Sequence, residues 1–240
     1  MADEYERSRY RARDSFRHPV NPLPHGTRAI YSAGVEFTEV IKRRRMHHAF
    51  TGEPLPPGTA RRLLRAANRG PSAGFAQGYS FLVLDGAEQA APLWEIFYDD
   101  AAAIPDREED ERAAIAALSP APLVIVPLAC KDIYLDQYAE HLGWTDRDEA
   151  RWPVPYWYID AGFTALLILL SVVDEGLGAS FFGIQPGITD AFRARFGVPE
   201  EWTPIGAIAI GYPDPASDPV GTPSPGLRKS LDDLVHQGCW

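Results

Sequence analysis

The chain of 240 residues is long enough for one large domain or two small ones, and its 45% hydrophobic content is ordinary for a globular protein. Acidic residues outnumber basic ones by 33 to 23, so the formal net charge of -10 argues against nucleic acid as the main partner. Cys130 and Cys239 are too few for a disulfide-rich scaffold or a zinc site built from cysteine alone. The charged N-terminus lacks the apolar core of a secretory signal, and the longest apolar run (residues 161–173) is too short to span a bilayer. We therefore expect a soluble, cytoplasmic protein without a membrane partner.

The first half of the chain predicts an arm followed by helices and strands. Residues 1–35 show no helical or strand period, and we expect an extended arm there. A first helix follows, in which Phe37, Val40 and Ile41 share one face with Arg44. A second helix is expected at residues 60–69, with Thr59 as its cap. The pattern then predicts a strand at residues 79–85, alanine-rich helices around 87–100 and 107–118, and a buried strand at 123–129.

The second half begins with an aromatic-rich segment. Residues 131–155 are expected to be irregular, and seven aromatic residues fall between positions 134 and 158. Residues 159–174 are apolar nearly all round, which predicts a helix buried at the centre of the molecule. Five prolines at residues 213–226 favour an extended crossing segment. The remaining predicted elements are strands at 178–184 and 205–212 and a short helix at 190–196. The class is therefore α+β, with four strands and a largely helical shell.

Known catalytic motifs are missing from the sequence. It contains no nucleotide phosphate loop, no dinucleotide fingerprint after a strand, and no nucleophile elbow. It contains neither H-E-x-x-H nor C-x-x-C, so no metal site is predicted. If the protein is an enzyme, we expect a cofactor to supply the reactivity.

Two segments in the first half are candidate binding sites. The segment RRRMHHAF, residues 43–50, is either a solvated basic face or an anion site, because Arg44 lies on the apolar stripe of the preceding helix and a buried arginine needs an anion. The segment GPSAGFAQGYSF, residues 70–81, is either an ordinary turn or a surface where small residues, Ser72 and Gln77 approach a flat polar ligand.

Two further segments lie in the second half. In EGLG, residues 175–178, Gly176 is explained as a helix C-cap, whereas Gly178 favours a planar group stacked against the backbone. In GLRKSLDDLV, residues 226–235, the basic pair Arg228 and Lys229 is either solvated, as is usual near a C-terminus, or part of a site.

In this order, the four segments resemble the FMN-dependent nitroreductase superfamily over roughly residues 37–235. The resemblance implies a nitroreductase-like three-layer α+β fold, in which helices wrap a central, mostly antiparallel sheet. It also implies an intertwined homodimer with exchanged C-terminal arms and two flavins at the interface. Residues 36–240 would form the FMN-binding domain, with residues 131–158 as a lid-like insertion and 213–240 as the crossing arm.

The resemblance also assigns roles to residues. Arg44 and Arg228 would hold the FMN phosphate, and His48 stands where the family has a second basic residue. The loop after the second helix would reach the flavin from the neighbouring subunit, and Leu177 and Gly178 would lie near the ring. The implied cofactor residues are Arg44, Arg45, Met46, His48, Pro71, Ser72, Ala73, Gln77, Leu177, Gly178, Arg228 and Lys229, and the implied substrate residues are Phe75, Tyr138 and Trp144.

Some positions depart from the family pattern. Met46 replaces a usual serine, Phe75 replaces a usual asparagine, and Gly78-Tyr79 replaces Pro-Trp. Loss of two hydrogen bonds is expected to weaken FMN binding by about tenfold to a hundredfold without abolishing it.

The resemblance implies an oxidoreductase in which NADH or NADPH reduces FMN. The flavin then reduces a nitro compound, a quinone or an enone by ping-pong hydride transfer, and no catalytic side chain is needed. The aromatic stretch at residues 134–158 is either a lid over a flat substrate or core at the dimer interface. The alternative function is a non-redox relative that binds or sequesters flavin with a degenerate site. A flavin-consuming enzyme such as dimethylbenzimidazole synthase is a third possibility, without a feature in its favour.

Overall fold

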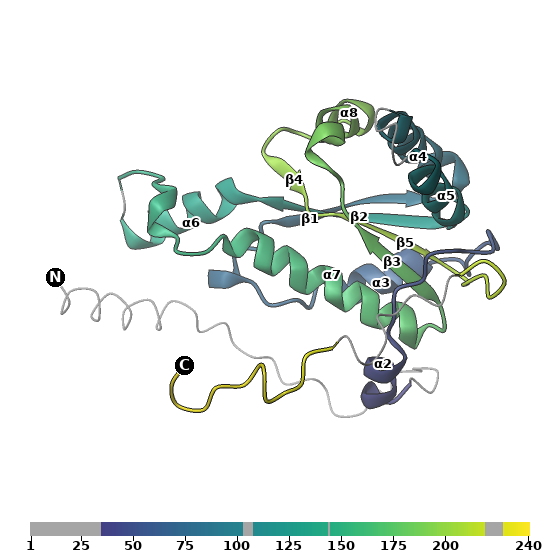
Figure 1. The fold of residues 1–240 in the computed structure, drawn as a ribbon. Helices are drawn as coiled ribbons and strands as arrows, with labels where there is room; N and C mark the ends of the chain where they lie inside the picture. The colour runs from purple at the N-terminus through teal and green to yellow at the C-terminus, as the bar shows by residue number, and fades with distance from the viewer. Residues whose placement is uncertain (1–34, 103–107, 144, 219–227) are drawn as a thin grey trace, which may run out of the picture.

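The computed structural model describes residues 35–102, 108–143, 145–218 and 228–240 of the chain. Their strands are β1 (Tyr79–Asp85), β2 (Leu123–Cys130), β3 (Gly178–Phe182), β4 (Trp202–Pro204) and β5 (Ala207–Gly211). They form one sheet of order β1-β2-β5-β3 in which all strand pairs are antiparallel (Figure 1). Sequence analysis missed β4, which pairs with the end of β2 just before the chain turns into β5. The turn contains Gly206, whose φ of 146° other residues rarely adopt.

Helices cover both faces of the sheet. The helices α4 (Ala87–Ala102), α5 (Glu108–Leu118) and α8 (Pro186–Phe196) lie on one face, and α3 (Thr59–Ala67) and α7 (Tyr156–Asp174) lie on the other (Figure 1). Side chains of a strand alternate between the faces, so Val124 and Val126 enter the first core while Leu123 and Ile125 enter the second. The three-layer arrangement of helices around an antiparallel sheet is therefore confirmed.

The N-terminal helices differ from expectation. α2 (Phe37–Arg43) ends before Arg44, and of its apolar face only Val40 is buried, whereas Phe37 is 68% exposed and Ile41 is 50% exposed. Thr59 is the first residue of α3 and not its cap, because Gly58 precedes the helix with a left-handed φ of 79° and the Thr59 hydroxyl donates to the Pro56 carbonyl at 2.7 Å.

The expectation of an irregular segment after β2 was wrong over its first half. Residues Lys131–Leu142 form the helix α6, which Gly143 ends in the left-handed conformation. Tyr134 and Leu135 are buried on one face of this helix. The aromatic rings that follow pack mainly within the chain, with Trp152 making edge contacts to Tyr134, Tyr138, Tyr156 and Trp157. The many aromatic residues of this region had obscured the helical pattern of residues 131–142 in the sequence.

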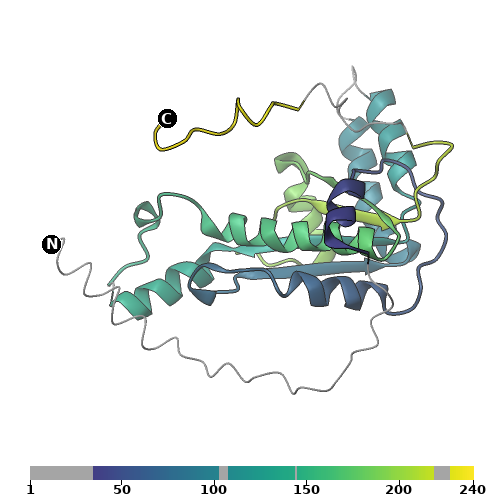
Figure 2. The ribbon, with the colours of Figure 1, turned by 90° about the horizontal axis from the view of Figure 1, so that it is seen from below.

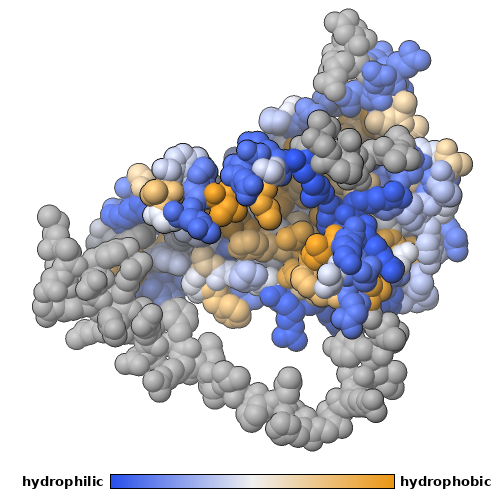
Figure 3. All heavy atoms as spheres, turned by 60° about the horizontal axis from the view of Figure 1, so that its bottom comes forward, coloured by the Kyte–Doolittle hydropathy of each residue, from blue (hydrophilic) through white to orange (hydrophobic). Residues whose placement is uncertain are grey.

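Helix α7 has 19 residues and is longer than the apolar run that marks it in the sequence. By length and composition alone it could cross a membrane, but it packs against α3 and β2 as the core helix of one layer. Figure 2 shows it running along the sheet. Its outer face is not buried as expected. Five large side chains of this face are 37–46% exposed, namely Tyr156, Tyr158, Ile159, Phe163 and Leu166. Figure 3 shows that hydrophobic residues gather on this side of the molecule.

Candidate functional site

The segment after α2 runs alongside the outer edge of β3. Met46 forms a parallel bridge with Ala179, and the His47 amide donates to the Ala179 carbonyl at 2.9 Å. The Met46 sulfur accepts from the Phe181 amide at 3.5 Å, so this side chain faces the sheet edge. The residue that replaces the usual serine therefore has a partner within the chain.

Gly178 allows this close approach. A Cβ atom at Gly178 would lie 2.5 Å from the Pro213 side chain and 2.9 Å from the His47 ring. The glycine is thus explained by packing within the chain, and a planar ring stacked at this point, as expected from the sequence, would meet His47 and Pro213. The Leu177 side chain is 7% exposed and belongs to the core below α7, which leaves its backbone as the part able to meet a ligand.

Asp218, which the sequence did not indicate as a site residue, holds residues 45–48 in place through its carboxylate. Its carboxylate accepts from the His48 amide at 2.8 Å, lies 2.8 Å from the His47 Nδ1 atom, and is 3.9 Å from the Arg45 guanidinium. Burial by itself would raise the pKa of Asp218, but these hydrogen bonds and the charge of Arg45 outweigh it and hold the pKa below its usual value. The sequence offered one signal for Asp218, which is its position as an acidic residue within a proline-rich stretch.

Among the described residues, no anionic group pairs with Arg44 of this segment. Its side chain is half-buried and makes no hydrogen bond or ion pair with any residue that the structure describes. Arg45, by contrast, donates from Nε to His47 and faces Asp218. A half-buried guanidinium without a carboxylate partner suits an anionic ligand group.

The second predicted site segment is the loop of residues 71–77, called the 71–77 loop below. Gly74 and Phe75 each have a φ of 58°, and Gln77 has a φ of 52°. Two of these are not glycine, so the backbone is strained, as is common where a loop serves a ligand. The Ser72 hydroxyl oxygen accepts from the Gln77 amide at 2.8 Å, and Phe75 projects with 64% of its surface exposed.

Helices α6 and α7 hold this loop. The buried Asp160 of α7, which is 2% exposed, accepts from the Ala73 amide at 2.7 Å and from the Tyr134 hydroxyl at 2.8 Å. Burial raises the pKa of Tyr134, and the hydrogen bond to Asp160 adds to this effect, so its hydroxyl remains a donor. Sequence analysis missed Asp160, although a single acidic residue inside an apolar helix needs a buried partner and could have been noticed.

From α6, Gln137 and Tyr138 also contact the loop at Gly74. The Gln137 side-chain amide donates to the Gly74 carbonyl at 2.6 Å, and a Cβ at Gly74 would lie 2.8 Å from the Tyr138 ring. Tyr138, a predicted substrate residue, is therefore beside the loop, packed between Gly74 and Trp152. Trp144, the other aromatic candidate in this region, lies outside the described residues.

Within one chain the two segments lie far apart. The 71–77 loop leads into β1 at the end where Tyr79 pairs with Ala129, near the end of β2. The segment at Met46 bridges to Ala179 of β3, on the opposite edge of the sheet (Figure 1). Through β5, Ala179 is level with Leu123, the first residue of β2. Strand spacing and rise place these corners about 25 Å apart. A single small ligand cannot contact both segments of one chain at this separation.

The C-terminal basic pair joins neither segment. Arg228 and Lys229 are exposed, and residues 228–240 run apart from the sheet in both views (Figures 1 and 2). The described hydrogen bonds of this stretch are local, as between Ser230 and Asp233. The predicted pairing of Arg44 with Arg228 thus stays a prediction.

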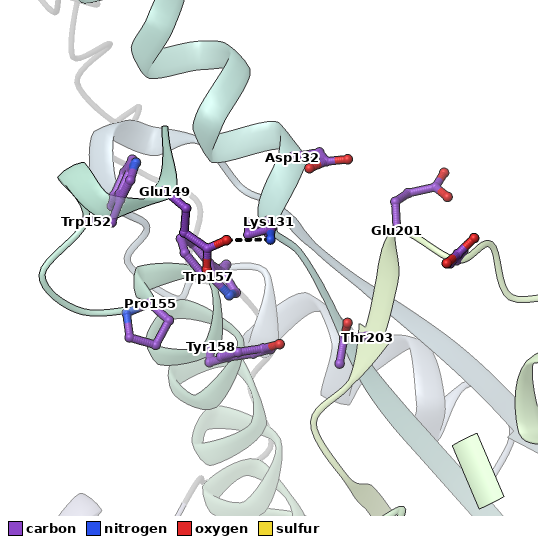
Figure 4. Close-up of a pocket in the computed structure, with 10 residues that line it drawn as sticks. Lys131, Asp132, Glu149, Trp152, Pro155, Trp157, Tyr158, Glu201 and Thr203 are labelled. Atoms are coloured by element: carbon purple, nitrogen blue, oxygen red, sulfur yellow. Dashed lines mark hydrogen bonds and ion pairs between the residues drawn. The ribbon is translucent and has the colours of Figure 1, made fainter. Parts of the chain in front are cut away.

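A cavity between α6, α7 and β4 lies away from both segments (Figure 4). It has a volume of about 730 Å³ and lies between the beginnings of α6 and α7 and strand β4. Among the described residues that line it, Lys131 is the one basic side chain, and its ammonium group is paired with Glu149 at 2.6 Å. Three more carboxylates line the cavity, so it repels a phosphate group; they are Asp132, Glu200 and Glu201.

Comparison with known proteins agrees with the fold. A family model described as "Nitroreductase family" matches residues 41–212. A candidate NADH dehydrogenase/NAD(P)H nitroreductase of Methanothermobacter thermautotrophicus is 25% identical over 210 residues, which is 86% of this chain and 88% of the relative. The nitroreductase CinD of Lactococcus lactis, solved with chloramphenicol, has a TM-score of 0.66 and 18% identity, with 84% of this chain and 99% of that chain covered. A candidate nitroreductase of Exiguobacterium sibiricum, solved with FMN, has a TM-score of 0.60 and 18% identity, with 85% and 98% covered. Because the family model spans well over half of the chain, this protein belongs to the nitroreductase family.

Proposed function

We propose that the protein is an FMN-dependent oxidoreductase that uses NADH or NADPH to reduce a small aromatic or conjugated acceptor. Family membership over residues 41–212 carries this proposal, and the FMN-bound structure of the Exiguobacterium sibiricum neighbour supports the choice of cofactor. Bound FMN would supply the hydride chemistry, which agrees with the lack of a catalytic motif in the sequence.

The residues of this chain suit FMN. The guanidinium of Arg44 lacks an anionic partner among the described residues and would hold the phosphate, with His48 beside it. Asp218 puts a negative charge close by, but it is engaged by Arg45 and by the His47 ring. These contacts limit its repulsion of a phosphate group.

The 71–77 loop would meet the flavin ring and ribityl chain. Its exposed Gln77 offers a polar side chain, and its small residues let the backbone approach a flat surface. Phe75 would exclude water from one side of a bound aromatic acceptor, because it is the large apolar side chain at the tip of this loop. The Lactococcus lactis neighbour was solved with nicotinic acid and with chloramphenicol, which are both aromatic.

The site requires two copies of the chain. Its two segments are about 25 Å apart in one chain, so one flavin contacts both only if the second segment comes from a partner. The exposed apolar face of α7, together with Phe37 and Ile41 of α2, would supply the contact surface of the homodimer. The C-terminal stretch would cross to the partner, since its Leu231, Leu234 and Trp240 are 56–100% exposed.

The test measures flavin and turnover separately. FMN is expected in the supernatant of the denatured protein after reconstitution, and the holoprotein should oxidise NADH or NADPH with an acceptor panel of nitroaromatics, quinones and enones. Release of no flavin, or of FAD alone, would contradict the cofactor assignment. Bound FMN without turnover on any acceptor would favour the alternative, a flavin-sequestering relative, which Met46 and Phe75 motivate as departures from the family pattern.

The register of the C-terminal site can be tested by paired variants. Arg228→Ala should weaken FMN binding more than Lys229→Ala, because a guanidinium can make two hydrogen bonds to one phosphate whereas an ammonium acts as a point charge. Flavin titrations of both variants provide the measurement. Equal losses would indicate a diffuse basic field, and a larger loss for Lys229→Ala would shift the register by one residue.

A further inference from the structure

We propose that Asp160 is a positioning residue of the flavin site, which holds the strained 71–77 loop from inside α7. The inference rests on the proposed function, in which this loop receives the flavin. Asp160 is 2% exposed, so it has almost no surface to offer a ligand and must act through the residues that it contacts.

The contacts of Asp160 connect the loop to two helices. A single carboxylate oxygen, Oδ2, accepts from the Ala73 amide at 2.7 Å and from the Tyr134 hydroxyl at 2.8 Å. Ala73 belongs to the loop, Tyr134 belongs to α6, and Asp160 itself lies in the first turns of α7. One buried group therefore fixes the position of the loop relative to both helices.

The loop needs such a tether because its backbone is strained. Phe75 and Gln77 follow Ala73 closely and have left-handed φ angles of 58° and 52°. Non-glycine residues keep this conformation only where the surroundings over-determine it. Further restraints include the Gln137 bond to the Gly74 carbonyl, the Ser72 bond to the Gln77 amide, and backbone bonds from the Phe75 amide to Ser72 and from the Ala76 amide to Ala73. Of the side chains Asp160, Gln137 and Ser72, only Asp160 is buried.

The role of Asp160 predicts a graded response to substitution. Asp160→Ala removes both bonds and leaves the Ala73 amide without its acceptor. Asp160→Asn keeps one carbonyl oxygen that can accept from both donors, but a neutral acceptor makes weaker bonds than a carboxylate. Loop opening and FMN dissociation constant should therefore increase from wild type to Asp160→Asn to Asp160→Ala, and the last should bind FMN at least about tenfold more weakly.

The experiment combines hydrogen exchange of the flavin-free protein with FMN titration by fluorescence quenching. The readouts are the exchange of the peptide that contains residues 71–77, the exchange of the β2 peptide as a reference, and the FMN dissociation constant. Asp174→Asn is the matched control, because it makes the same change at the opposite end of α7, where the carboxylate accepts from the Val35 amide at 2.8 Å. Asp174 is about 21 Å from Asp160 along the helix, so this control should leave loop exchange unchanged.

Faster exchange confined to the loop, together with weaker FMN binding, would support the role. Unchanged loop exchange in Asp160→Asn and Asp160→Ala would overturn it, as would a loosened loop that still binds FMN with wild-type affinity. If Asp160→Ala does not fold, Asp160→Asn decides, since it must then show faster exchange in the loop than wild type and an unchanged rate of exchange in β2. A wild-type protein that binds no FMN would overturn the proposed function and the flavin role of Asp160, while the exchange data would still decide whether Asp160 holds the loop.

Discussion

Removal of the Asp218 carboxylate should destabilise the protein, because this group fixes residues 45–48 beside β3. Its two hydrogen bonds, to the His48 amide and the His47 ring, are both 2.8 Å long, and its side chain is 7% exposed. Loss of a largely buried, charge-assisted acceptor that leaves an amide without a partner costs about 2–4 kcal/mol. We expect this loss for Asp218→Ala at pH 7, and about half of it for Asp218→Asn, whose carbonyl can still accept from His48.

The cost should depend on pH in a defined direction. The pKa of Asp218 is lower in the folded protein than its usual value, so its contribution is fully present above the unfolded pKa of about 3.9. It is lost as the pH falls through the lower pKa of the folded state. The difference in free energy of unfolding between wild type and Asp218→Asn should therefore shrink as the pH falls below about 4.

Urea unfolding of both proteins between pH 7 and pH 3 measures this difference. Glu95→Gln is the control, because it removes an exposed carboxylate of α4 and should give a small difference at every pH. A gap between wild type and Asp218→Asn that stays constant or widens towards pH 3 would refute the assignment of Asp218 as the buried anchor of this segment.

Two further predictions concern the interface and the packing of the 71–77 loop. Phe163→Glu places a charge on the exposed apolar face of α7, and light scattering should show a shift from dimer to monomer; an unchanged dimer would place the interface elsewhere. Gly78→Ala would put a Cβ 2.3 Å from the Tyr134 ring and should destabilise the protein by about 1–3 kcal/mol in urea unfolding. Gly183→Ala, where a Cβ meets nothing within 4 Å, is its control, and equal losses in both would show that the Gly78 contact does not matter.

The family and the order of the elements were readable from the sequence, because they depend on local patterns. The strand at residues 79–85 has the predicted bounds, and the buried strand at 123–129 was extended by one residue to Cys130. Both strands combine an apolar run with clear ends. The continuous apolar run of β2 is buried on both faces, whereas the edge strand β1 is only partly buried. The candidate site segments were proposed in the same way, since basic, small and glycine residues occur at characteristic positions.

Several details could not be predicted from local patterns. The helix α6 has weak amphipathicity, and its aromatic residues favoured an irregular segment until the fold showed Tyr134 in the core. Arg44 was placed on a buried face, but Phe37 and Ile41 of that face are exposed, and among the described residues only Val40 of α2 is buried. Gly178 was explained by a ligand, whereas the structure gives the space to His47 and Pro213.

The sequence by itself therefore determined the fold class and the family, and it supplied the candidate segments for a flavin site. Only the tertiary structure decided that these segments lie at opposite corners of the sheet. It also showed that the carboxylates of Asp160 and Asp218 hold their backbone amides, at Ala73 and His48. The physical reason is that hydrophobic periodicity and turn residues act over a few neighbouring positions. The partners of a buried carboxylate, in contrast, are separated by 87 residues for Asp160 and Ala73 and by 170 for Asp218 and His48. Contacts of this range are fixed by strand order and helix packing, which no local pattern encodes.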